Sequence, residues 1–303
     1  MYGNRSVVED AVIAWLQDAT IGGKGIDTAI DYNNDDLVGT ALHKVLHSNT
    51  TTNNNTLTRA DVFITTKQPG PIGYTQTITA LQEALVRLQT SYVDLYLIHF
   101  PGNASETELR QETWLGMEEV VRRGWTKAIG VSNYGITELQ ETLEVATIRP
   151  ALNQILWNPV THDDALLEYC QRYGIMVEAY SPLGGHQSRH GEVLALPVLQ
   201  YLAAQHNVST AQIALKWTLQ HGMTLTTGTT NPQHMQTDLD VFQFRLNDSE
   251  LALISQIQQQ PQHQHYYSNG GTTTTKTTTT TTNNDNSSIE SSSSSSTLRK
   301  RHH

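Results

Sequence analysis

The chain is poor in cysteine, in basic residues and in long apolar runs. Its 303 residues include a single cysteine, Cys170, so no disulfide bond can form within the chain. No apolar run approaches the ~20 residues that a membrane-spanning helix needs, and no signal peptide is visible. The net charge of −10 is opposite in sign to a surface that binds nucleic acid. We therefore expect a cytoplasmic protein with no nucleic-acid or membrane partner, and we take a monomer as its expected state.

What the sequence does contain is a regular alternation of strand-like and helix-like segments. Seven runs are predicted as strands: 25–29, 61–67, 93–100, 126–133, 151–157, 175–182 and 223–229. The predicted helices are 7–19, 35–46, 77–89, 113–124, 137–147, 163–174, 210–222, one from Pro232 to near Val241, and 246–257 with Asn247 or Ser249 as its cap. This alternation is typical of parallel β-α units. It predicts an α/β fold of the (β/α)8 TIM-barrel type over residues 1–257.

The first strand of such a barrel is missing or incomplete in this prediction. Met1 stands directly before a predicted helix, so we expect either a truncated first strand or a true start upstream of Met1. A gene fragment that does not fold is a further reading. Residues 48–56 have the composition of a low-complexity loop insertion, and residues 258–303 that of a disordered polar tail.

Four polar residues lie at or just beyond the ends of the first three predicted strands, where a barrel displays its chemistry. They are Asp27, Tyr32, Lys67 and His99. A phenol is a weak acid, with a pKa of about 10, and a nearby ammonium such as Lys67 stabilises its phenolate. Asp27 can hold the lysine, and a neutral His99 can donate a hydrogen bond to a carbonyl oxygen. The set predicts proton delivery to a carbonyl as hydride reaches its carbon.

These residues lie in phrases that resemble the aldo-keto reductase superfamily. The phrases are DTAIDY (27–32), DDLVGTAL (35–42), ITTK (64–67), DLYLIHFP (94–101), IGVSNY (129–134), LNQILWNP (152–159) and AYSPLG (179–184). The resemblance covers residues 5–258. It implies an oxidoreductase that reduces an aldehyde or ketone with hydride from NAD(P)H. By the same resemblance Tyr32 is the general acid, Lys67 and Asp27 tune it, and His99 orients the small-molecule carbonyl substrate.

The resemblance also implies a cofactor site, and it departs from the family at one end. The nicotinamide carboxamide would meet Ser132, Asn133 and Gln154, its ring would stack on Tyr180, and Ser181 and Leu183 would line the pyrophosphate path. Reductases of this family often carry Lys and Arg against the adenosine phosphate. Here those positions are Gly228 and His234, with Thr229 and Thr230 beside them. NADP(H) is favoured by the family, and NAD(H) is the alternative.

Two aromatic residues are candidates for the walls of the substrate pocket. Resemblance suggests Phe100 and Trp157 as apolar walls, although Trp157 could equally be a core residue. Nothing in the sequence indicates a metal cluster or an activated Ser or Cys nucleophile. The competing function is a non-catalytic, nucleotide-binding regulatory subunit with the same barrel, which the altered phosphate site favours.

Overall fold

A computed structural model describes residues 5–18, 21–47, 57–185 and 190–257. They belong to one compact unit, Met1–Gln264. The predicted insertion at 48–56 and the predicted tail at 258–303 lie outside the described residues. Within the described residues, no helix has the length and apolarity to cross a membrane.

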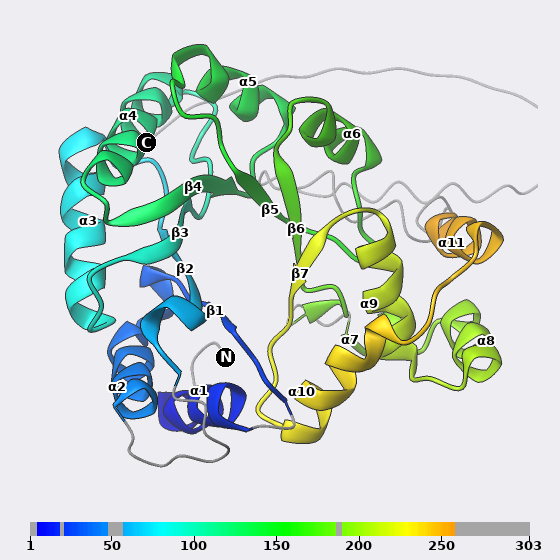
Figure 1. Cartoon of the computed structure of the whole chain (residues 1–303). Coiled ribbons are helices and arrows are strands. Elements are labelled where there is room, and N and C mark those ends of the chain that lie inside the picture. The colour runs from blue at the N-terminus through cyan, green and yellow to red at the C-terminus, as the bar shows by residue number, and fades with distance from the viewer. Residues whose placement is uncertain (1–4, 19–20, 48–56, 186–189, 258–303) are drawn as a thin grey trace, which may run out of the picture. The chain divides into compact units, whose positions relative to one another are not determined.

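Seven parallel strands form one sheet in chain order, and it curves into a nearly closed barrel (Figure 1). The strands are β1 (Gly25–Asp27), β2 (Phe63–Gln68), β3 (Val93–Ile98), β4 (Thr126–Ser132), β5 (Leu152–Leu156), β6 (Met176–Tyr180) and β7 (Thr224–Thr226). Each is hydrogen-bonded to the next, and no pairing joins β1 to β7 among the described residues. Over the described residues, the fold is a (β/α)8 barrel that lacks one strand, as predicted.

The helices surround this ring of strands (Figure 1). They are α1 (Val8–Gln17), α2 (Asp35–Leu46), α3 (Tyr74–Arg87), α4 (Thr107–Arg122), α5 (Ile136–Val145), α6 (Asp164–Arg172), α7 (His190–Leu194), α8 (Pro197–His206), α9 (Thr210–Gln220), α10 (Pro232–Leu239) and α11 (Asp248–Ser255). Short 3-10 turns lie at η1 (Arg5–Val7), η2 (Ile30–Tyr32), η3 (Arg59–Asp61) and η5 (Asp240–Phe242).

Side-chain alternation along β3 shows how the strands divide the core. Leu95 and Leu97 pack with Leu152 in a small cluster, whereas Tyr96 and Ile98 belong to the main cluster that also contains the buried faces of the helices. Successive strand residues face opposite sides of a sheet. The small cluster therefore fills the inside of the barrel, and the main cluster lies between the strands and the helices.

Helix ends follow the capping residues in the sequence. The Asn247 side chain accepts a hydrogen bond from the backbone N–H of Glu250, so Asn247 rather than Ser249 is the cap of α11. Asn231 caps α10, with Pro232 at its first position, as predicted. The sequence reading missed α7 and α8, and it began α4 six residues late, at Thr113 instead of Thr107. Pro197 at the first turn of α8 was the available signal.

Cys170 is a packed core residue. Its side chain is fully buried in α6, and the Asn153 amide lies 3.9 Å from its sulfur. Burial raises the pKa of the thiol to about 11, so the reactive thiolate is disfavoured at neutral pH.

Candidate active site

The carboxyl ends of the strands bring the predicted catalytic residues to one rim of the barrel. Asp27 is the last residue of β1, Lys67 lies one residue before the end of β2, and His99 directly follows β3. Tyr32 ends the 3-10 turn η2 that follows β1. Parallel strands in register place their carboxyl ends side by side. Residues that are up to 72 positions apart in the sequence are therefore neighbours here.

Lys67 is the centre of this group. Its side chain has no solvent exposure, and its ammonium nitrogen Nζ lies 2.5 Å from Asp27 Oδ1, 3.0 Å from the Thr28 carbonyl oxygen and 3.4 Å from the Tyr32 hydroxyl. The ammonium thus donates to a carboxylate, a carbonyl and the phenol at once. A buried charge requires such partners. The geometry places a fixed positive charge against the Tyr32 oxygen.

His99 stands beside Tyr32 and is held as a neutral imidazole. The two rings meet edge to face, with centroids 5.7 Å apart. Burial lowers the pKa of His99, and the positive charge of Lys67 lowers it further. Asp31 Oδ2, at 3.5 Å from His99 Nδ1, acts in the opposite direction. A neutral imidazole next to a phenol can donate a hydrogen bond to the same substrate oxygen that the phenol protonates.

The residues predicted for the carboxamide form a connected layer next to His99. The Asn133 amide nitrogen donates to the His99 carbonyl oxygen at 2.9 Å and to Ser132 Oγ at 3.1 Å. Its oxygen accepts from the Tyr180 hydroxyl at 2.7 Å, and Ser132 Oγ donates to the Gln154 carbonyl oxygen at 2.9 Å. Ser132 ends β4, Asn133 directly follows it and Tyr180 ends β6, so these side chains are fixed by one another and by the backbone of β5 before any ligand arrives.

Two residues of this region have left-handed backbone conformations. The φ angle is 62° at Asn133 and 52° at Ser181, and both follow directly after a strand. Asn tolerates this region better than most residues, whereas Ser does so less often. Leu183, two residues after Ser181, is partly buried against the main core cluster. The two turns redirect the chain at the rim of the barrel, where the pyrophosphate path is predicted.

Glu178 is a site residue that the sequence reading missed. Gln154 Nε2 donates to Asp27 Oδ2 at 2.9 Å and to Glu178 Oε1 at 2.8 Å, so a buried amide joins two carboxylates. Thr224 Oγ1 donates to the other Glu178 oxygen at 3.1 Å. Burial raises the pKa of Glu178, and the hydrogen bond from Gln154 opposes this shift. The available signal was a single acidic residue within the otherwise apolar strand run at 176–180.

The predicted adenosine-phosphate end is open. Gly228, Thr230 and His234 are exposed, and Thr229 is partly buried. Thr229 Oγ1 accepts from the Asn231 backbone N–H at 3.1 Å, just before α10 begins at Pro232. Asp238 on α10 interacts electrostatically with His234. This end thus carries hydroxyls, one imidazole and a carboxylate, in place of the Lys and Arg that the family often has.

The two predicted substrate walls have different surroundings. Phe100 is 48% exposed and stacks on the His99 ring, with centroids 4.4 Å apart, so it can contact a ligand at the rim. Trp157 is fully buried and stacks on Trp217 at 5.7 Å, with His162 packed against it. The structure therefore places Trp157 in the core, the alternative that the sequence left open.

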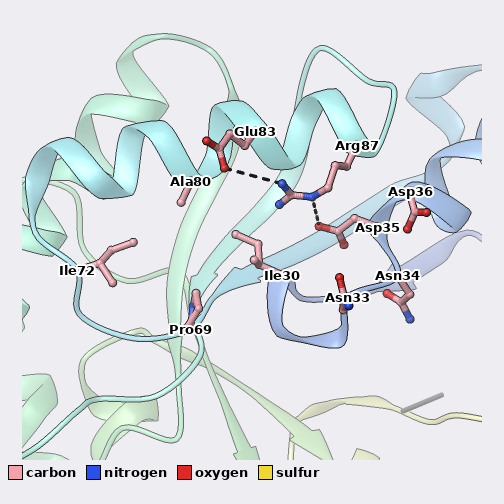
Figure 2. Close-up of a pocket in the computed structure, with 10 residues that line it drawn as sticks. All are labelled: Ile30, Asn33, Asn34, Asp35, Asp36, Pro69, Ile72, Ala80, Glu83 and Arg87. Atoms are coloured by element: carbon pink, nitrogen blue, oxygen red, sulfur yellow. Dashed lines mark ion pairs between the residues drawn. The ribbon is translucent and has the colours of Figure 1, made fainter. Parts of the chain in front are cut away.

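A cavity of about 400 Å³ lies on the outer side of the barrel, between the loop that carries Tyr32 and helix α3. Figure 2 shows Arg87 at its wall, with ion pairs to Glu83 and Asp35. The cavity is lined by residues on either side of Tyr32, such as Ile30 and Asn33, but by none of the four predicted catalytic side chains. Its size suits a small ligand, yet the chemistry described above lies elsewhere.

Comparisons of the sequence and of the structure with known proteins find the same family. The profile of the aldo/keto reductase family matches residues 2–259. Glyoxal reductase of Bacillus subtilis is 35% identical over 234 residues, which are 77% of this chain and 78% of that protein. A crystal structure of a Bombyx mori aldo-keto reductase in complex with NADP is 32% identical with a TM-score of 0.74, and the match covers 84% of each chain. An aldo-keto reductase from a Medee basin deep-sea metagenome library is 29% identical with a TM-score of 0.76, covering 85% of this chain and 88% of that one.

Proposed function

From the premise that this chain belongs to the aldo/keto reductase family, we propose that Tyr32 protonates the carbonyl oxygen of an aldehyde or ketone as its carbon accepts hydride. The chain is an oxidoreductase of carbonyl compounds. NADP(H) supplies the hydride when bound. The single observation that carries the assignment to Tyr32 is the contact of its hydroxyl, at 3.4 Å, with the buried Lys67 ammonium, which Asp27 holds at 2.5 Å.

The roles of the four residues follow from their contacts. Lys67 donates to the Tyr32 oxygen and stabilises the negative charge that develops there when the proton leaves. Asp27 neutralises and orients the buried ammonium. His99, neutral because of burial and of Lys67, donates to the substrate oxygen and orients the carbonyl. Phe100, stacked on His99, forms an apolar wall beside that oxygen.

The proposed cofactor contacts fit the groups that are present. Ser132, Asn133 and Gln154 offer amide and hydroxyl groups that can pair with a carboxamide. Tyr180, whose hydroxyl donates to Asn133, is assigned to stack on the nicotinamide ring. Ser181 and Leu183 are assigned to the pyrophosphate path. Gly228, Thr229, Thr230 and His234 are assigned to the adenosine phosphate. NADP bound to the Bombyx mori relative supports the phosphorylated cofactor.

Turnover by the Tyr32→Phe variant tests the proposal. With a panel of aldehydes and ketones, we expect the wild type to oxidise NADPH, and the variant to lose about two to four orders of magnitude in kcat. Its dissociation constant for NADPH should stay within about twofold, because the hydroxyl donates to the substrate and not to the cofactor. Tyr201→Phe, at a 60% exposed tyrosine, is the matched control and should keep full activity.

Two outcomes would point elsewhere. Full turnover in Tyr32→Phe would remove Tyr32 as the acid. Cofactor binding without turnover in the wild type at any pH would support the non-catalytic regulatory barrel.

Location in the cytoplasm and a monomeric state belong to the proposal as well. The single, buried cysteine supports the former, because an oxidising compartment offers this chain no internal disulfide.

A further inference from the structure

The amide of Gln154 uses both of its N–H donors inside the protein. Gln154 is 2% exposed, and its Nε2 donates to Asp27 Oδ2 at 2.9 Å and to Glu178 Oε1 at 2.8 Å. A primary amide nitrogen carries only two hydrogens, and ionised carboxylates are acceptors only. The two carboxylates therefore dictate which end of the amide faces them. A ligand that approaches Gln154 meets its carbonyl oxygen.

Glu178 is held in place by the register of the sheet. Glu178 lies on β6, where it pairs with Gln154 on β5 and with Thr224 on β7. Each neighbour donates to a different Glu178 oxygen, Gln154 at 2.8 Å and Thr224 at 3.1 Å. The charged groups that act on it from across the barrel are Asp27 on β1 and Lys67 on β2. The position of the Glu178 carboxylate thus depends on strand pairing and not on a flexible loop.

We propose that Glu178 is a positioning residue that locks the orientation of the Gln154 amide and so makes it an acceptor for the N–H of the nicotinamide carboxamide. The inference rests on the proposed function, in which Gln154 contacts that carboxamide. Turning the amide by half a turn would bring its oxygen against two carboxylates, with the loss of two hydrogen bonds to charged groups. With Glu178 in place, the reverse orientation is strongly disfavoured.

Replacement of Glu178 by glutamine removes one of the two carboxylates that hold the Gln154 amide, while the volume is kept. An amide at position 178 can either accept from Gln154 or donate to it, so only Asp27 then opposes the reverse orientation, which becomes more populated. In the reverse orientation the Gln154 nitrogen faces the ligand and repels an amide N–H. The predicted consequence is a loss of selectivity for a carboxamide, and not a general loss of cofactor binding.

The test compares NADPH with its acetylpyridine analogue, in which a methyl group replaces the amide nitrogen. Dissociation constants are measured by quenching of tryptophan fluorescence, without substrate. We expect the wild type to bind NADPH about tenfold more tightly than the analogue, the size of one net hydrogen bond. In Glu178→Gln the ratio should fall by about twofold or more from the wild-type value, with the analogue bound as well as before. Glu168→Gln, an exposed carboxylate on α6, should keep the wild-type ratio.

Further outcomes separate this proposal from the proposed function. A Glu178→Gln ratio equal to that of the wild type would overturn the locking role, as would a wild type that binds both cofactors equally. Neither result touches Tyr32, whose role is decided by turnover of Tyr32→Phe. If Glu178→Gln does not fold, Thr224→Val serves instead. This variant frees one Glu178 oxygen, and a reduced ratio is expected from it in the same direction.

Discussion

The Lys67 ammonium and the Asp27 carboxylate form an ion pair inside the barrel, 2.5 Å apart, in which the lysine side chain has no solvent exposure. Such a pair is sensitive to the removal of either partner, because the remaining charge stays in a poorly solvated place. The same ammonium contacts Tyr32 at 3.4 Å. Stability and catalysis therefore depend on the same atom.

The Lys67→Met variant should have lower turnover and lower stability than the wild type. We expect kcat to fall by about two orders of magnitude or more, because the charge next to Tyr32 is gone. The free energy of unfolding should fall by about 3 kcal/mol, because Asp27 loses its buried partner. Stopped-flow turnover and urea unfolding measure the two effects. Lys44→Met, at an exposed lysine paired with Glu9, is the control and should leave turnover unchanged. Unchanged turnover in Lys67→Met would refute the catalytic role of the ammonium.

The pH dependence should report on His99. Its pKa lies below the ordinary value of about 6.5, first because of burial and second because of Lys67. The neutral form therefore persists as the pH falls below 6.5, and loss of kcat/KM on the acid side should begin only at lower pH. Asp31 opposes this shift, so Asp31→Asn should move the acid limb of the profile further down. An NMR titration of the His99 imidazole measures the shift of its pKa directly.

The matched control for this experiment is Asp10→Asn, which changes an exposed carboxylate on α1 that is far from His99 in sequence and should leave the profile in place. A shift of the acid limb upward in Asp31→Asn would contradict the assignment of His99 to that limb. An unchanged limb would mean that another group controls it.

The cofactor preference can be strengthened by restoring positive charge at the open end. Gly228 and His234 are both exposed, and a Cβ added at Gly228 meets no atom within 4 Å. The double variant Gly228→Lys/His234→Arg should therefore fold normally and tighten NADPH binding by about tenfold or more, since Arg and Lys pair with phosphate. Binding of NADH, which lacks that phosphate, should change by less than about twofold. Fluorescence titration of both cofactors at two salt concentrations provides the measurement, and equal gains for both cofactors would remove these positions from the phosphate site.

Much of the site was predictable from the sequence, because its residues occupy strand ends. Asp27, Lys67 and His99 each close an apolar run, and parallel strands bring such ends together. The contacts between Gln154, Asp27 and Glu178 could not be predicted in this way. Gln154 and Asp27 are 127 residues apart, and only the curvature of the sheet brings their side chains within hydrogen-bonding distance. Trp157 shows the same limit, since its apolar ring suits either a core or a pocket wall until its packing against Trp217 is known.

Helix α8 illustrates a different limit. Its buried residues Leu199, Leu202 and Ala203 have helical spacing. Its neighbour α7 is only five residues long, and the sequence around these two helices has no clear apolar periodicity. Short helices depend on tertiary packing more than on their own propensity. The α8–α9 and α8–α11 contacts supply that packing here.

Asp94, on β3, is a buried carboxylate that should dominate stability on the acid side. Its oxygens accept from Arg59 at 2.9 Å, from Lys127 at 2.7 Å and from the Ile64 backbone N–H at 3.0 Å. Burial alone would raise its pKa, but these hydrogen bonds outweigh burial and lower the pKa below the model-compound value of 3.8. A lowered pKa means that the stabilisation is fully present above that value and is lost as the pH falls through the lower, folded-state value.

Asp94→Asn should therefore cost about 3 kcal/mol of unfolding free energy at neutral pH. The difference from the wild type should shrink as the pH falls below about 4, because the wild-type carboxyl is then protonated in turn. Urea unfolding across this range measures the difference. Lys127→Met removes only an exposed partner of Asp94 and should have a much smaller effect, whereas Arg59→Met removes a largely buried one and should lie between the two. A difference between wild type and Asp94→Asn that stays constant with pH would show that Asp94 stabilises the barrel by packing and not by its charge.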